Sequence, residues 1–257
     1  MRINTNVGAL NSSKNAFINT MATESSMRKL SSGLRISRAA DDAAGLSIAN
    51  KLRAQSRSLT VASANAEQGN AMLQIAEGSA STIQRILERQ KELIIQREST
   101  GNNASVSTTL NTEISTLSSE VGRIISSTNF QGSTVFASLD FQVSDGTSGG
   151  QVTVNASLAA TSVSLAGTAT IGNVDTALDA INSVLASIGA GQNRLDYTVQ
   201  NLKSAVVNVK AAESTIRDVD MAEEMANYTK NNILTQAAQA MLAQANQSSE
   251  RVLSLLR

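Results

Sequence analysis

The chain has 257 residues, enough for one or two domains. Its 21 Lys and Arg balance its 21 Asp and Glu, so it lacks the basic character of a nucleic-acid-binding protein. Cys and His are both absent, which excludes disulfides, thiol nucleophiles, a histidine base and metal sites built from these side chains. No stretch approaches the roughly 18 apolar residues of a membrane span, so membrane insertion is not expected.

Small side chains dominate the apolar content. Aromatic residues make up only 2% of the chain, and many of the hydrophobic 41% are Ala, which buries little area. Pro is absent, which removes the commonest helix breaker. The composition therefore predicts a mainly α protein whose long helices pack closely along their length.

Residues 1–40 have the pattern of an amphipathic helix, with a break predicted near Gly33. Their larger apolar side chains are mostly three, four or seven apart, the spacing of one helix face: Val7, Leu10, Phe17, Met21, Met27, Leu30 and Leu34. The N-terminus has no apolar h-region, so we expect no cleaved secretory signal.

Asp41 and Asp42 suit the positive end of a helix dipole, and a long helix is predicted from there to about residue 100. One heptad row is apolar throughout: Leu52, Leu59, Ala66, Leu73, Ala80, Leu87 and Ile94. A second row is mostly small: Gln55, Ala62, Gly69, Ala76, Ile83 and Gln90. Such rows indicate a coiled-coil-like seam, and a helix of about 60 residues would be a rod of about 90 Å.

A turn is predicted at 101–103, followed by a third helix that folds back on the rod. Residues 129–173 are rich in Ser, Thr, Gly and β-branched residues. Alternation at Phe141 and Val143, and again at Val152 and Val154, predicts a β-hairpin. A second alternating run around Val163 suggests a further strand.

Residues 174–217 resume the helical pattern and are predicted to close a three-helix bundle, with a joint at Arg217–Asp218. The last stretch, 218–257, carries a second apolar stripe: Met221, Met225, Tyr228, Ile233, Leu234, Met241, Leu242, Val252, Leu253 and Leu256. Because the chain offers no bulky core to cover either terminal stripe, we expect both to contact other chains. A membrane-surface role is the alternative, but the richness in Ala, Ser, Asn and Gln favours helix packing.

Several strings closely resemble the terminal signatures of bacterial flagellins. In chain order they are Lys29–Ile36, Ala40–Gly45, Ile48–Asn50, Gly191–Leu195, Leu242–Gln247 and Val252–Arg257. The resemblance covers about residues 1–130 and 174–257, on both sides of the middle segment. Matches of this length and order are highly specific.

The resemblance implies a structural subunit that polymerises into the extracellular flagellar filament and is exported by the flagellar type III system. Residues 1–40 and 218–257 would pair in an inner tube, disordered in the free monomer, and 41–217 would form the next layer. It further implies an export chaperone, a filament cap and hook–filament junction proteins as partners, and no cofactor. Outer domains, which many members insert in the middle, are expected to be missing here.

The resemblance also implies a patch recognised by an animal innate immune receptor. Aligning Glu92–Gln96 with the family pattern places the patch at Arg89, Leu93 and Glu113. Glu88, Gln90, Lys91 and Ile94 depart from the commonest pattern. Arg89 and Glu113 fit equally well as an ordinary surface ion pair, worth about 0–1 kcal/mol.

Other interpretations are weaker. Asp41–Asp42 suits a helix start better than a metal or acid–base site, and the exposed methionines suit adaptable packing better than metal binding. A hook–filament junction protein and a monomeric secreted ligand are the rival functions. An enzyme is the least favoured, because no nucleophile–base pair or metal cluster can be assembled from the sequence.

Overall fold

The computed structural model describes residues 5–99, 103–144, 150–158 and 170–255. Five helices contain most of them: α1 (Val7–Ser32), α2 (Ala43–Arg97), α3 (Ala104–Ser127), α5 (Ile171–Arg217) and α6 (Met221–Leu255). The chain divides into two compact units, one of residues 1–54 with 209–257 and the other of 55–208. The mainly α prediction is confirmed.

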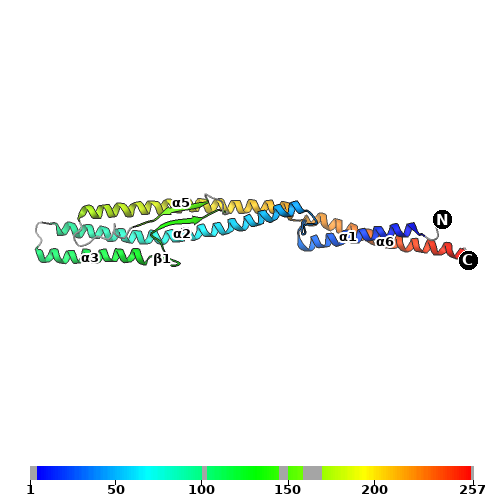
Figure 1. The fold of residues 1–257 in the computed structure, drawn as a ribbon, viewed down its shortest axis with the longest axis horizontal. Coiled ribbons are helices and arrows are strands. Elements are labelled where there is room, and N and C mark those ends of the chain that lie inside the picture. Colours follow the sequence, from blue (N-terminus) through cyan, green and yellow to red (C-terminus); the bar gives the residue numbers. More distant parts are fainter. Residues whose placement is uncertain (1–4, 100–102, 145–149, 159–169, 256–257) are drawn as a thin grey trace. The chain divides into compact units, whose positions relative to one another are not determined.

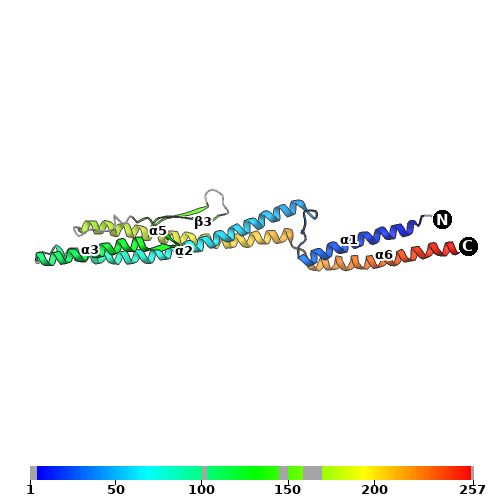
Figure 2. The same ribbon diagram turned by 60° about the horizontal axis from the view of Figure 1, so that its bottom comes forward.

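In the unit of residues 55–208, α2 lies beside α3 and α5 and runs antiparallel to both (Figures 1 and 2). Arg97 of α2 donates to Asn111 of α3, and Gln90 donates to the carbonyl of Ile114. Earlier residues of α2 thus contact later residues of α3, so the two helices run in opposite directions. The contacts between α2 and α5 show the same antiparallel order. They are Glu67 with Lys203, Asn70 with Asp196, Glu77 with Gln192 and Lys91 with Asp175.

The core of this unit is the seam that the heptad rows predict. From Leu59 to Ile94, every member of the apolar row is buried, with Leu73 and Leu87 fully so. The small row is buried from Ala62 to Gln90. Alternating Leu and Ala lets the helices approach closely, which compensates for the missing aromatic core.

The predicted hairpin is present as β3 (Ser138–Gln142) paired antiparallel with β4 (Gln151–Asn155). A smaller hairpin that the pattern did not indicate joins β1 (Asn129–Phe130) to β2 (Ser133–Thr134). Its two turn residues, Gln131 and Gly132, have φ of 51° and 84°, as a type I′ turn requires. The residues between β3 and β4 at 145–149, and the suggested strand near Val163, lie outside the described residues.

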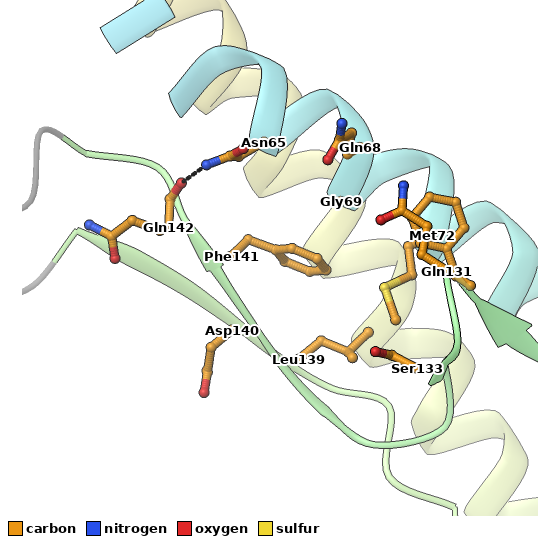
Figure 3. A pocket seen from close by; sticks show the side chains of 11 residues that line it. Asn65, Gln68, Gly69, Met72, Gln131, Ser133, Leu139, Asp140, Phe141 and Gln142 are labelled. Carbon is orange, nitrogen blue, oxygen red and sulfur yellow. Dashed lines mark hydrogen bonds between the residues drawn. The ribbon is translucent and has the colours of Figure 1, made fainter. Parts of the chain in front are cut away.

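Two helix glycines seat the β3–β4 hairpin. In Figure 3 the Phe141 ring points at α2 over Gly69, where an added Cβ would come within 2.8 Å of the ring. On α5, a Cβ at Gly191 would come within 2.6 Å of Val154. Asn65 donates to the carbonyl of Gln142 at 3.4 Å and closes the α2 side of the contact.

In the other unit, α1 packs along α6 (Figures 1 and 2). Gly33 ends α1 in the left-handed conformation, with φ of 68°, and its N–H donates to the carbonyl of Lys29. This places the predicted break at Gly33. The predicted joint at Arg217–Asp218 is also present, because α5 ends at Arg217 and α6 begins at Met221.

Candidate self-assembly surface

The seam between α1 and α6 consists mostly of small and polar side chains, and Met27 borders it. Thr20 and Thr23 of α1 line a groove together with Asn232 and Thr235 of α6. At one end Asn6 donates to the carbonyl of Ala245 at 2.9 Å. Such residues let two helix backbones approach closely while contributing little apolar burial.

An ion pair marks the other end of this seam. The Nζ of Lys29 lies 3.7 Å from a carboxylate oxygen of Glu224, whose side chain is only 11% exposed. Among the α1 and α6 residues with described burial, only Ser26 and Glu224 are buried. The helix pair therefore has a polar centre, unlike the apolar core of residues 55–208.

Most of the large apolar side chains of the same helices are exposed. Eight of the predicted assembly residues are between 42% and 66% exposed: Val7, Leu10, Phe17, Met21, Met225, Ile233, Leu234 and Met241. Four others, Leu30, Leu34, Tyr228 and Leu242, are half-buried. Leu253 lies in α6 without a described side chain, and Leu256 lies outside the described residues. An exposed apolar surface of this kind is typical of a protein–protein contact.

Further exposed apolar residues fall outside the predicted stripes. Ile18 is exposed on α1, but it directly follows Phe17 and so does not fit the three–four spacing. In the unit of residues 55–208, Val61, Tyr197 and Val207 are exposed as well. Their only signal in the sequence is an apolar residue off the heptad seam, which is too common to identify a contact.

The segments that join the terminal helices to the rest of the chain are tied to each other. Leu34 and Asp218 form an antiparallel bridge, and the N–H of Val219 donates to the carbonyl of Gly33. Arg35 donates twice, from its N–H to the carbonyl of Arg217 and from its guanidinium to the carbonyl of Ile216, both at 2.6 Å. The N-terminal and C-terminal connections are thus held as a pair.

The two aspartates at the start of α2 have structural roles. Asp42 accepts from the N–H of Gly45 at 2.9 Å and so caps the helix. Hydrogen bonds to the Asp41 carboxylate, first from the N–H of Arg38 and then from that of Ser37, hold its pKa below the ordinary value. Both carboxylates therefore accept hydrogen bonds from backbone N–H groups within four residues of them.

The residues of the suggested receptor patch divide between surface and core. Arg89 lies 3.3 Å from Glu113 and 2.9 Å from Glu92, and all three side chains are about half exposed. These ion pairs, Glu92 first, raise the pKa of Arg89. Leu93 is only 1% exposed and belongs to the core. A partner approaching this surface would therefore meet Arg89 and Glu113 before Leu93.

The part of the chain that the structure describes contains no group of three or more carboxylates placed to hold a metal ion. Within those same residues, no helix is long and apolar enough to cross a membrane.

Comparison with known proteins identifies the relatives of this chain. Residues 3–140 match the bacterial flagellin N-terminal helical region, and residues 171–256 match the bacterial flagellin C-terminal helical region. The 30 residues between the matched regions are fewer than an independent domain usually needs, which is consistent with a short form without outer domains.

Individual flagellins and filament proteins align with this chain over their whole length. The chain is 40% identical to a flagellin of Bacillus subtilis, 42% identical to a flagellin of Halalkalibacterium halodurans and 37% identical to the flagellar filament 33 kDa core protein of Treponema phagedenis. In each pair the alignment covers 100% of both chains. A crystal structure of Bacillus cereus flagellin is 27% identical, with a TM-score of 0.48 over 58% of this chain and 94% of that one.

Proposed function

Because this chain belongs to the bacterial flagellin family and is a structural subunit of the extracellular flagellar filament, we propose that it assembles through α1 and α6. The observation that carries the proposal is the exposure of eight large apolar side chains on these two helices, even where the helices pack on each other. Their cover must come from outside the helix pair.

The energetics favour cover by further copies of the chain. Full burial of one large apolar side chain is worth about 1.5–3 kcal/mol, and each subunit offers many. Ordering the helices costs conformational entropy, which only contact with several neighbours would offset. A net charge of zero allows many copies to stack without long-range repulsion. Free subunits would then remain dispersed, while addition to a filament end is favourable.

The same reasoning assigns the layers of the filament. We propose that residues 1–40 and 218–257 form an inner tube and that residues 41–217, with the hairpin region at about 129–173, form the layer around it. The polar α1–α6 seam supports this assignment, because it pairs the helices within one subunit and leaves their apolar faces for neighbours.

Truncation tests the proposal. Variants lacking residues 1–30 or residues 230–257 should keep the helical circular dichroism of the 55–208 unit and fail to form filaments. Electron microscopy under polymerising salt, with the full chain alongside, reports the outcome. Filaments of normal length and diameter from either truncated variant would overturn the proposal, and so would a full chain that stays dispersed.

Family membership also supports the route by which the chain reaches the filament. We propose that it is exported by the flagellar type III system, and that an export chaperone, the filament cap and hook–filament junction proteins are its partners. A chaperone that binds the exposed α6 face would shield it before assembly. Loss of export after deletion of the flagellar type III genes, measured in the culture medium, tests this route.

A second proposed role is recognition by an animal innate immune receptor at Arg89 and Glu113. The exposed ion pair between these residues supports it. We expect Arg89→Ala and Glu113→Ala to weaken binding of a receptor ectodomain without loss of helicity. Arg123→Ala, which removes another exposed arginine from its ion pair with Glu120, is the matched control. If Arg89→Ala and Glu113→Ala bind the receptor ectodomain as tightly as the original chain and Arg123→Ala do, this role is refuted.

A further inference from the structure

Methionine is the only sulfur-containing residue type in this chain, which has seven Met and no Cys. Five of these methionines lie on α1 and α6, where they are 49–62% exposed: Met21, Met27, Met221, Met225 and Met241. Met72 of α2 is buried in the other unit. The thioethers are therefore concentrated on the surface that assembly would cover.

These methionines lie next to the grooves and exposed apolar side chains of α1 and α6. Met27 borders two grooves, one with Thr20 and Asn232 and the other with Ser31 and Ser37. Met221 and Met225 are four residues apart and share one face of α6. Met21 stands four residues from the exposed Phe17 in the same way.

Exposed thioethers react with peroxides. The sulfur lone pair attacks one oxygen of hydrogen peroxide and the O–O bond breaks. The departing hydroxide takes the proton from the oxygen that is now bound to sulfur and leaves as water. The sulfur loses two electrons and becomes a sulfoxide, and the peroxide is reduced. A flexible apolar side chain becomes polar, with an S–O dipole that needs a hydrogen-bond partner. In a packed apolar contact that dipole is costly.

We propose that these five methionines make the terminal helices an oxidation-sensitive site, at which peroxide-class oxidants block addition of the free subunit to a filament. The inference rests on the proposed function, because the methionines matter only if other copies cover them. It has a converse. Once a subunit has been incorporated, the same cover protects its thioethers from peroxide.

The first test compares free subunits before and after peroxide. Peptide mass spectrometry should find sulfoxide at the five α1 and α6 positions well before Met72. After removal of the peroxide, elongation of filament seeds should be about tenfold slower, equivalent to roughly 1.4 kcal/mol. Treatment with methionine sulfoxide reductases A and B should restore the rate. Unchanged elongation by subunits oxidised at all five positions would overturn the inference.

A matched variant separates the site from general damage. In M21L/M27L/M221L/M225L/M241L the five thioethers become leucines of similar volume, whereas Met72 stays. This variant should elongate at the same rate with and without peroxide treatment. A loss as large as that of the treated original chain would place the damage elsewhere and overturn the inference.

The third measurement needs no substitution. Assembled filaments and free subunits are exposed to the same peroxide, and sulfoxide at the five positions is followed with time. Oxidation should be about tenfold slower in filaments, the effect of a site protected by roughly 1.4 kcal/mol. Equal rates would overturn the inference. Failure of the untreated original chain to elongate would instead refute the proposed function, so the two failures are distinguishable.

Discussion

Gln90 is a polar side chain fully enclosed in the core between α2 and α3. Its amide nitrogen donates to the carbonyl of Ile114 at 3.1 Å, while its Oε1 has no hydrogen-bond partner among the described residues. An unpaired buried carbonyl costs about 1–3 kcal/mol. The heptad rows predicted this position as a seam residue, but they could not indicate whether both ends of the amide would be satisfied.

We expect Gln90→Leu to raise the free energy of unfolding by about 1 kcal/mol, because the unpaired carbonyl is removed at little change in volume. Gln90→Ala should lower it by about 2 kcal/mol, because a cavity replaces the side chain. Urea unfolding followed by circular dichroism measures both. A stability loss in the leucine variant equal to that in the alanine variant would show that the amide contributes more than it costs.

Gly191 and Gly189 lie on the same helix and differ in their surroundings. A Cβ at Gly191 would meet a Val154 methyl at 2.6 Å, whereas at Gly189 it would meet nothing within 4 Å. We expect Gly189→Ala to gain about 0.5–1 kcal/mol of stability, the usual helix effect. Gly191→Ala should lose about 1–3 kcal/mol through overpacking against β4.

A double-mutant cycle identifies the cause. Val154→Ala should cost less in the Gly191→Ala chain than in the original chain, because the smaller side chain makes room for the new methyl. Equal costs in both backgrounds would mean that Gly191 does not seat the hairpin. The sequence placed Gly69 in a row of small residues, and Gly191 appeared only within the flagellin-like string Gly191–Leu195. It could not name Phe141 or Val154 as the side chains that fill them, because these come from strands distant along the chain.

At the scale of elements, α1 shows why amphipathic spacing alone is ambiguous. The three–four pattern predicted a stripe, but it does not state which partner the stripe faces. In the structure, small and polar residues such as Thr23 and Ser26 face α6, and Phe17 faces outward. The bulky side chains are mostly exposed, because small Ser and Thr side chains already fill much of the narrow seam.

We expect Phe17→Asp to abolish filament growth and to leave the helicity of the free subunit unchanged, because the ring is 66% exposed. A charge buried without a partner at a subunit contact costs several kcal/mol. Asn15→Asp, two residues earlier, is the matched control, because it adds the same charge at an exposed position that does not share the helix face of Phe17. This control should form filaments more readily than Phe17→Asp. Seeded elongation followed by light scattering measures both. Normal elongation by Phe17→Asp would remove this residue from the assembly surface.

The connection before α2 carries a pH dependence. The pKa of Asp41 is held below its ordinary 3.8 by the N–H groups of Arg38 and Ser37, so its carboxylate stabilises this connection above that pH. The contribution should be lost as the pH falls below 3.8 and through the lower folded-state pKa. A carboxyl titration of Asp41 by NMR should therefore find a midpoint under 3.8. A midpoint at or above that value would contradict the hydrogen bonding described.

Across the whole molecule, the sequence predicted the helices, the hairpin, the break at Gly33 and the joint at Arg217, because each depends on local spacing or on a single capping residue. It did not predict the β1–β2 turn, the burial of Leu93 or the polar α1–α6 seam. These depend on contacts between distant segments, which a pattern in one segment does not contain. The domain layers and the receptor surface remain predictions about assemblies larger than one chain.

The central claim is that other copies cover the apolar faces of α1 and α6. Hydrogen exchange of the free subunit and of the filament, compared amide by amide, tests it most directly. We expect the amides of α1 and α6 to exchange far faster in the free subunit than in the filament, with a smaller change in α3. Equally strong protection of both terminal helices in the isolated subunit would contradict the claim.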